Sequence, residues 1–220
     1  MFRAVIFDWR GTLVTTLTEH AWVHAALARL HRDTHPAQIN ELVAAIRTAS
    51  GQPDRLEAAG VDSDAGLHRS TYLQVFRDAG LDDALASALY DVESDAGYNS
   101  FAADASATLR VLTGRGLRVA VCSDIHFDIR PAFAAAGMAG LVDVFTLSFE
   151  QGMQKPDPLM FTRTLQALGV DPAGALLVGD RSGPDGAAVE QGVTTLLLPP
   201  LRGAEDRRLH LVLALCPASP

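Results

Sequence analysis

Short apolar runs that each stop at a polar or glycine residue recur along the chain and predict the strands of a parallel sheet. These runs are rich in β-branched and aromatic residues. They cover residues 3–7, 117–122, 142–147, 175–178 and 193–198. Segments with helical periodicity lie between them, over 104–115, 128–136, 158–168 and 184–191. Strands that alternate with helices are typical of a doubly wound α/β fold, with helices on both faces of the sheet.

Residues 16–96 interrupt this alternation, because they show helical periodicity and no strand pattern. The helices are expected near 18–32, 36–49, 64–79 and 82–96, with proline or glycine at the breaks. We therefore predict two domains. Residues 1–15 and 97–220 form the α/β core, and residues 16–96 form an inserted helical domain. The last residues, 216–220, are expected to form a frayed tail.

Composition and charge narrow the class of protein. Hydrophobic residues make up 48% of the 220 residues and charged residues 20%, which is ordinary for a globular protein. A net charge of −8 argues against a nucleic-acid partner, since phosphate backbones require an excess of Lys and Arg. Neither a membrane span nor a signal peptide is expected, and Cys122 and Cys216 form no disulfide framework. We expect a cytoplasmic protein; the sequence carries no signal of an oligomeric state.

Three polar residues fall at the ends of predicted strands. Asp8, Ser123 and Asp180 each follow or close an apolar run, and ligands of open parallel sheets bind at the carboxyl ends of the strands. A carboxylate such as Asp8, followed by the flexible Gly11, can act as a nucleophile. Carboxylates gathered at one crevice repel one another unless a cation lies among them, and oxygen ligands suit Mg²⁺. Asp180 and Asp185, five residues apart across a turn, can both face such a cation.

Lys155 is the only lysine of the chain, and it lies in a loop stiffened by Pro156 and Pro158. An ammonium at this position can offset the charge of a nucleophile and of a transferred group. We therefore interpret Lys155 as a functional residue.

Four sequence fragments in this order resemble the motifs of the haloacid dehalogenase superfamily, in the subgroup whose helical cap follows the first motif. The fragments are Phe7-Asp-Trp-Arg-Gly-Thr-Leu13, Val121-Cys-Ser123, Lys155-Pro-Asp-Pro158, and Gly179-Asp180 with Asp185. The resemblance implies a Rossmann-like core, an aspartyl intermediate at Asp8, a transferred group held by Ser123, and Lys155 steadying both. It also implies Mg²⁺ bound by Asp8, the backbone carbonyl of Arg10, Asp180 and Asp185. Further candidate substrate contacts are Thr12, Asp124, His126 and His20.

Arg10 departs from the family pattern. Phosphatases of this superfamily carry a second aspartate two residues after the nucleophile, where it protonates the leaving oxygen and then activates water. A guanidinium cannot exchange a proton usefully at neutral pH. Arg10 can instead clamp a substrate anion or pair with a carboxylate.

Three interpretations of Arg10 stay open at this point. The first is a hydrolase that acts on good leaving groups or borrows a base from Glu19, His20, His126 or Asp128. The second is dehalogenase-like or phosphonatase-like chemistry. The absence of lysine from residues 16–96 argues against a phosphonatase, and the Asp180–Asp185 pair argues against a dehalogenase. The third is a catalytically silent protein in which Arg10 pairs with Asp8 or Asp180 in place of the cation.

We predict a Mg²⁺-dependent hydrolase of a small, phosphorylated and therefore anionic metabolite, slow or specialised because of Arg10. The alternative is a silent relative that binds an anionic metabolite or a protein. The direction in which Arg10 points discriminates between them. His20 and His24 are expected to be solvated, Trp9 and Trp22 to serve packing, and the arginines at 202, 207 and 208 to lie on the surface.

Overall fold

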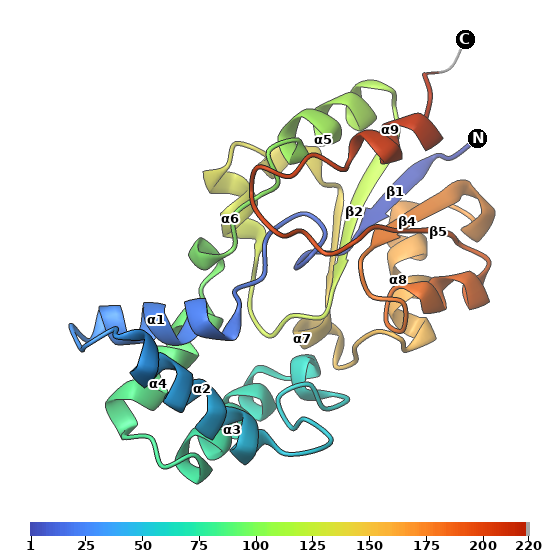
Figure 1. The fold of residues 1–220 in the computed structure, drawn as a ribbon. Coiled ribbons are helices and arrows are strands. Elements are labelled where there is room, and N and C mark those ends of the chain that lie inside the picture. The colour runs from blue at the N-terminus through green and yellow to red at the C-terminus, as the bar shows by residue number, and fades with distance from the viewer. Residues whose placement is uncertain (219–220) are drawn as a thin grey trace.

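The computed structural model describes residues 1–218, and its centre is a parallel sheet. The strands are β1 (Ala4–Phe7), β2 (Arg118–Ser123), β3 (Val144–Leu147), β4 (Ala175–Gly179) and β5 (Thr194–Leu197). Their order across the sheet is β3-β2-β1-β4-β5, and every pairing is parallel (Figure 1). This arrangement confirms the predicted doubly wound α/β fold.

The central strand β1 positions the first predicted site residue. Its last residue, Phe7, lies opposite Val121 of β2 and Val178 of β4. Asp8 follows directly, and its backbone N–H donates to the carbonyl of Val178 at 2.9 Å. Because parallel strands end at one edge of the sheet, the residues after β1, β2 and β4 meet there.

Both faces of the sheet are covered by helices, as the near-continuous apolar strands require. One face packs against α5 (Ala105–Gly114), α6 (Arg130–Ala135) and α9 (His210–Leu215). The other packs against α8 (Pro158–Leu168) and the 3₁₀ helix η5 (Gly186–Gln191). Alternate strand residues serve the two faces: Val5 and Phe7 point to the first, Ala4 and Ile6 to the second.

The sequence predictions differ from the structure at several elements of the core. The helix predicted over 184–191 is the 3₁₀ helix η5, and α7 (Ser148–Gln151), α9 and the short 3₁₀ helices η3 (Ala139–Leu141) and η4 (Pro172–Gly174) were not predicted. The tail prediction is wrong for Cys216, which is buried and whose carbonyl accepts a hydrogen bond from Arg115. Residues 219 and 220, the end of that tail and of the predicted core domain, lie outside the described residues.

Residues between β1 and α5 form a separate group of helices, which we call the helical unit (Figure 1). It consists of α1 (Glu19–Arg29), α2 (Pro36–Ser50), η1 (Val61–Ser63), α3 (Ala65–Asp78) and α4 (Asp83–Glu93). The side chains of Thr18, Asp64 and Asp82 accept hydrogen bonds from backbone amides at the starts of α1, α3 and α4. The unit has an apolar core of its own, built around Trp22, Phe76 and Leu89.

Two chain segments connect the helical unit to the sheet, and they run side by side. The backbone N–H of Thr15 donates to the carbonyl of Ser100 at 2.9 Å, and the Asn99 side-chain amide donates to the Thr15 carbonyl at 2.9 Å. The second segment contains the 3₁₀ helix η2 (Ala96–Tyr98). Hydrogen bonds between the two connections set where the helical unit meets the core.

Among residues 1–218, no helix is both long enough and apolar enough to cross a membrane.

Replacing Phe133 by Ala should lower the free energy of unfolding by about 3–5 kcal/mol. Phe133 is fully buried, and its ring lies 5.1–5.2 Å from those of Trp9, Phe101 and Phe145. The matched control is Leu159→Ala in α8, where the side chain is 47% exposed, and it should change stability by less than about 0.5 kcal/mol. Denaturant unfolding measures both. Equal losses in the two variants would contradict the core assignment.

Candidate active site

A buried ammonium joins two carboxylates at the carboxyl edge of the sheet. Nζ of Lys155 lies 2.6 Å from Oδ1 of Asp8 and 2.5 Å from Oδ1 of Asp185. The Lys155 and Asp185 side chains are fully buried, and that of Asp8 is 4% exposed. Asp8 comes from the end of β1, Lys155 from the loop before α8, and Asp185 from the loop after β4. The structure thus brings together three predicted site residues from three distant parts of the chain.

Burial and charge act against each other in this group. Burial raises the pKa of Asp8 to about 7, although the neighbouring Lys155 opposes that shift. Burial alone would lower the pKa of Lys155, but the attraction of Asp8 and Asp185 raises it well above its ordinary value. Burial also acts to raise the pKa of Asp185, yet Lys155 holds it below its ordinary value. Both shifts favour the charged forms of Lys155 and Asp185.

Asp185 also shapes the loop after β4. Its Oδ2 accepts hydrogen bonds from the backbone N–H groups of Asp180 (3.1 Å) and Arg181 (3.0 Å). A Cβ at Gly179 would lie 2.4 Å from Cγ of Asp185, so the close approach requires glycine. Since both oxygens of Asp185 already accept hydrogen bonds, its main effect is to position Asp180.

The carboxylates form a donor set that fits a divalent cation. Oxygens of Asp8, Asp180 and Asp185 all lie within 4.8 Å of one another. Burial, and then repulsion by Asp185, raises the pKa of Asp180. Hard oxygen donors in a crowded acidic group suit Mg²⁺. Asp8 and Asp180 are the better direct ligands, because the oxygens of Asp185 are committed to hydrogen bonds.

Asp124 ties the Lys155 loop to the end of β2. Its Oδ1 accepts a hydrogen bond from the backbone N–H of Lys155 at 2.8 Å, and its Oδ2 accepts one from Arg181 at 3.1 Å. Burial raises the pKa of Asp124. Asp124 lines the cavity described below, so it combines a structural contact with access to a ligand.

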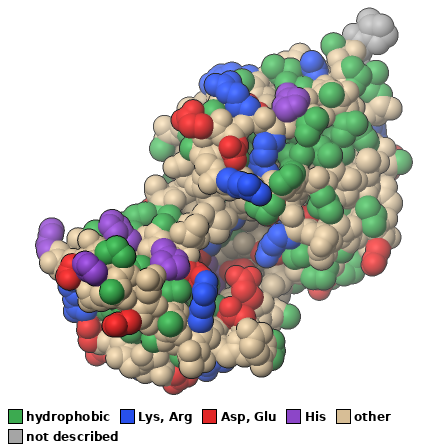
Figure 2. Space-filling model, viewed as in Figure 1, with side chains coloured by type: hydrophobic (Ala, Val, Ile, Leu, Met, Phe, Trp, Pro, Cys, Tyr) green, Lys and Arg blue, Asp and Glu red, His purple; other side chains and the backbone are tan. Residues whose placement is uncertain are grey.

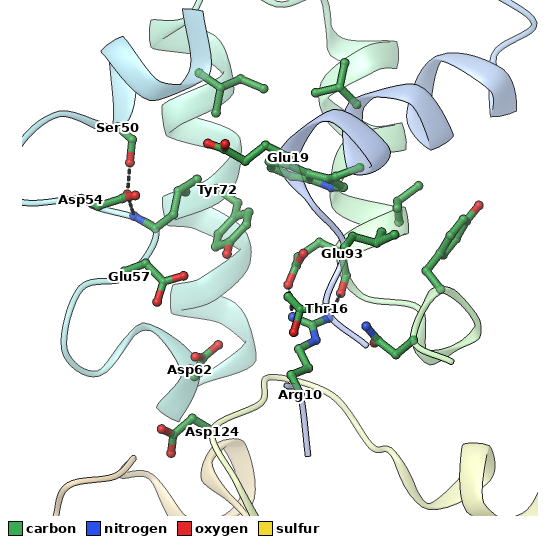
Figure 3. A pocket seen from close by; sticks show the side chains of 18 of the residues that line it. Arg10, Thr16, Glu19, Ser50, Asp54, Glu57, Asp62, Tyr72, Glu93 and Asp124 are labelled. Carbon is green, nitrogen blue, oxygen red and sulfur yellow. Dashed lines mark hydrogen bonds and ion pairs between the residues drawn. The ribbon is translucent and has the colours of Figure 1, made fainter. Parts of the chain in front are cut away.

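The Arg10 side chain extends to Glu93 of the helical unit (Figure 3). Its guanidinium forms an ion pair with Glu93, the last residue of α4, and Nη2 donates to the Glu93 carbonyl at 2.7 Å. A cation at this end of a helix is favourable, because the carbonyls there carry partial negative charge. The interpretation in which Arg10 replaces the cation by pairing with Asp8 or Asp180 is therefore wrong.

Ser123 and Thr12 differ in what they can contact. Ser123 lines the cavity, and within residues 1–218 its hydroxyl has no hydrogen-bond partner, so it is free to bind a ligand. Thr12 is fully buried and does not line the cavity. Its hydroxyl donates to Oδ1 of Asp180 at 3.4 Å, a long contact that orients Asp180. Thr12 therefore helps to position Asp180, and it does not line the cavity as a substrate contact would.

His20 and His126 also lie away from the cavity. His20 contacts Asn40 on the exposed side of the helical unit, with 2.9 Å between Nε2 and Oδ1. His126 is buried, its Nε2 lies 2.9 Å from the Ser94 hydroxyl, and its ring stacks on that of His68 at 3.4 Å. Burial lowers the pKa of His68 to about 3, so that ring is neutral. Neither side chain lines the cavity described below.

The remaining candidate bases for replacing the missing aspartate are also engaged. Asp128 pairs with Arg130 outside the cavity. Glu19 lines the cavity and forms an ion pair with Arg47. None of the four proposed substitutes is a free base beside Asp8.

A cavity of about 500 Å³ lies between the helical unit and the sheet edge. Figure 2 shows the surface hollowed there, with acidic side chains gathered in the hollow. Its floor is formed by Asp8, Ser123, Asp124, Asp180 and Arg181, and α1 to α4 all contribute to its walls. A cavity of this size accommodates a small organic molecule as well as the group that reacts at Asp8.

Sequence reasoning missed three arginine or glutamate contacts of the site. Arg181 follows Asp180 and binds Asp124, while Glu93 holds Arg10. Arg208, expected on the surface, is half-buried and donates to the carbonyls of Gly11 (2.9 Å) and Thr12 (2.8 Å). Only Arg181 could have been noticed in the sequence, because it directly follows the strand-end residue Asp180. The contacts of Glu93 and Arg208 depend on packing between distant parts of the chain.

Comparisons with known proteins identify the family of this chain. Residues 2–191 match the family described as haloacid dehalogenase-like hydrolase. The chain is 32% identical to the mouse "Haloacid dehalogenase-like hydrolase domain-containing protein 3" over 117 residues, which is 51% of this chain and 47% of that protein. The zebrafish protein of that name, from Danio rerio, is 29% identical over 154 residues, 66% of this chain and 62% of the relative. The matched parts thus span about half to three-fifths of these relatives.

Solved structures show the same fold. An HAD phosphatase from Thermococcus onnurineus superposes with a TM-score of 0.65 at 20% identity, covering 99% of both chains. A structure described as a dehalogenase gives a TM-score of 0.69 at 23% identity, covering 100% of this chain and 98% of the other. These neighbours share the doubly wound fold in which the strand-end carboxylates and Lys155 lie. The chain belongs to the haloacid dehalogenase-like hydrolase family.

Replacing Lys155 by Met should lower the free energy of unfolding by about 3–5 kcal/mol at pH 8, because two buried carboxylates lose their counter-charge. The double variant Lys155→Met with Asp8→Asn should recover part of that loss. Denaturant unfolding of the wild type, the two single variants and the double variant measures the coupling. A Lys155→Met loss below about 1 kcal/mol would contradict a charge-balancing role.

Replacing Gly11 by Ala should disturb Asp180, since the new Cβ would lie 2.4 Å from its Oδ2. The matched control is Gly80→Ala: Gly80 has a similar positive φ of 75°, against 78° for Gly11, and nothing within 4 Å of the added Cβ. Both variants should lose about 1 kcal/mol of stability from backbone strain. Only Gly11→Ala should also weaken Mg²⁺ binding, measured by calorimetry. Equal Mg²⁺ affinity in the two variants would contradict the assignment of Asp180 as a Mg²⁺ ligand.

Proposed function

We propose that this protein is a Mg²⁺-dependent hydrolase of phosphate esters that works through an aspartyl intermediate at Asp8. The observation that carries this proposal is the position of Asp8 on the cavity floor, with one oxygen bound by Lys155 and with Asp180 beside it. The other oxygen of Asp8 has no hydrogen-bond partner among the described residues, so it is available to attack. The helical unit serves as a cap over the substrate.

Each residue of the site has a proposed part in that reaction. Lys155 keeps Asp8 oriented and lowers the charge that the incoming phosphoryl group meets. The Ser123 hydroxyl donates to a phosphoryl oxygen. Asp8 and Asp180, positioned by Asp185 and joined by the Arg10 carbonyl, would hold Mg²⁺, which neutralises phosphoryl oxygens when it is bound.

Arg10 restricts which substrates react well. It occupies the position of the family's acid–base residue, cannot donate a proton at neutral pH, and is held by Glu93. A leaving oxygen must then depart as an anion or take its proton from water. This requirement favours phosphorylated metabolites whose leaving groups are acidic, such as aryl, enol or acyl groups.

A small-molecule substrate fits the cavity. A cytoplasmic location and the absence of nucleic-acid and membrane partners stay predictions from the sequence. The alternative is a catalytically silent protein that binds an anionic metabolite or a protein. The following experiment distinguishes it from the proposed hydrolase.

Phosphate release should depend on Mg²⁺ and on Asp8, and should be faster for aryl and acyl phosphates than for alkyl phosphates. Asp8→Asn should abolish it. Arg10→Asp should raise the alkyl phosphate rate by about 10²–10⁴-fold, because it restores an acid–base group. The panel is wild type and both variants, with and without Mg²⁺. Silence of the wild type with activity in Arg10→Asp would favour the silent alternative, and Mg²⁺-dependent release by Asp8→Asn would overturn the proposal.

Mg²⁺ affinity should fall as the pH is lowered below about 7. The pKa of Asp8 is raised to about 7 by burial, so in the metal-free protein a proton occupies this carboxylate at lower pH and competes with the cation. The decrease should approach tenfold per pH unit. Because the folded protein holds this proton more tightly than the unfolded chain, the metal-free protein should become less stable as the pH rises from 3.8 to about 7. Bound Mg²⁺ should restore that stability.

Calorimetric titration of Mg²⁺ at pH 6, 7 and 8 measures this effect. Asp128→Asn, which alters a carboxylate outside the cavity, serves as the control and should keep the wild-type dependence. An affinity that does not change between pH 6 and pH 8 would contradict the assignment of Asp8 as a ligand.

A further inference from the structure

The cavity is much larger than a phosphoryl group, so most of its walls face the part of the substrate that leaves. At about 500 Å³ it extends from Asp8 into the helical unit, between the labelled side chains of Figure 3. The leaving group therefore determines most of the contacts that a substrate makes. This inference rests on the function proposed above, in which a phosphate ester reacts at Asp8.

One part of the wall is apolar. Trp22 of α1, Val43 and Ile46 of α2, and Leu56 of the following loop contribute to it. The Trp22 indole N–H is already bound to the Leu89 carbonyl at 2.8 Å, so the ring offers only an apolar surface. Such a wall stabilises a hydrocarbon or aromatic body and gives nothing to a sugar hydroxyl.

The rest of the cavity wall is acidic, and it carries fewer arginines than carboxylates. Two of the arginines that line the cavity are committed, Arg10 to Glu93 and Arg47 to Glu19. Asp54 accepts hydrogen bonds only from neutral donors, the Ser50 hydroxyl and the backbone N–H of Leu56.

Glu57 is the least compensated of these acids. Within residues 1–218 it makes no hydrogen bond and no ion pair. Burial raises its pKa despite the more distant attraction of Arg181, and repulsion by Asp62 and Asp54 adds to the rise. In Figure 3 its carboxylate points into the cavity, between Asp54 and Asp62. A carboxylate in this place gains from a cation that the protein itself does not supply.

A second, independent feature points to a ligand with hydrogen-bond donors. Tyr72 of α3 is 92% buried, being 8% exposed, and its hydroxyl has no partner among the described residues. Figure 3 shows this hydroxyl directed into the cavity, on the side of the acidic residues. Because the hydroxyl opens onto the cavity, a ligand there can hydrogen-bond to it.

We infer that the substrate's leaving group has an apolar body, packed against Trp22 and Ile46, and a positively charged amine, received by Glu57 and Asp54. The protein is thus a phosphatase for the phosphate esters of amine-bearing, largely apolar phenols. Leaving groups that carry a carboxylate or a further phosphate are rejected by the same acidic side chains.

Three aryl phosphates test this inference, because they differ only in a remote charge. They are the phosphate esters of tyramine, para-ethylphenol and para-hydroxyphenylpropionate. Their phenols have similar acidity, so the bond that breaks is nearly the same in each. The value of kcat/KM should fall in that order, by about tenfold from the amine to the carboxylate, since Asp54 and Glu57 are exposed and their pairing is screened by solvent. Added salt should reduce the difference.

Glu57→Gln should shrink the ratio between the amine and the carboxylate esters to about threefold or less. The matched control is Glu41→Gln on α2 of the helical unit, an exposed acid that does not line the cavity, and it should leave all three rates unchanged. Equal rates for the three esters, a faster carboxylate ester, or a ratio that Glu57→Gln does not alter would overturn the inference.

A binding measurement separates this inference from the proposed reaction. Calorimetry with tyramine and with para-hydroxyphenylpropionate requires no turnover, and tyramine should bind more tightly to the wild type than to Glu57→Gln. If no ester is hydrolysed, the proposed function fails while the amine preference is still decided by these affinities. If esters are hydrolysed but tyramine binds no better than the carboxylate, the inference fails and the proposed function stands.

Discussion

The buried contact of Lys155 with Asp8 and Asp185 is the interaction on which the site depends. Three charged groups are withdrawn from water at the carboxyl edge of the sheet, and each would destabilise the fold if it were left alone. Joined, they fix the end of β1, the loop before α8 and the loop after β4 relative to one another. The same contact keeps one oxygen of Asp8 occupied and the other unpaired, which is the condition for a positioned nucleophile.

In the proposed function, the helical unit and Arg10 determine what can meet Asp8. Arg10 connects the loop after β1 to the end of α4 through Glu93, so the residue that replaces the acid–base aspartate now links the core to the helical unit. The cavity that results is apolar on one side and acidic on the other. Chemistry at Asp8 without a strong proton donor and recognition by an acidic wall together favour substrates with acidic, amine-bearing leaving groups.

The strand-end residues could be predicted from the sequence because local pattern and topology suffice for them. Apolar runs that stop at Asp8, Ser123 and Asp180 predicted both the parallel sheet and the edge at which these residues meet. Lys155 stood out as the only lysine, and the structure brings it to Asp8. The family resemblance rested on the same fragments, and the match over residues 2–191 confirms it.

The remaining features depend on contacts between residues far apart in the chain. The partner of Arg10 could not be predicted, since Glu93 lies 83 residues away at the end of a helix whose packing the sequence does not reveal. Thr12, His20 and His126 were expected at the substrate from their positions along the chain, but their side chains bind Asp180, Asn40 and Ser94. Arg208 reaches the loop after β1 from the far end of the chain, a contact with no local signal.

Trapping the intermediate tests the central claim most directly. The wild-type protein is mixed with Mg²⁺ and an aryl phosphate, quenched in acid during the first turnover, digested, and analysed by mass spectrometry. The peptide containing Asp8 should gain the mass of one phosphoryl group, at Asp8, and lose it as phosphate is released. Phosphate release with an unmodified Asp8 peptide, or with the phosphoryl group on another residue, would contradict it.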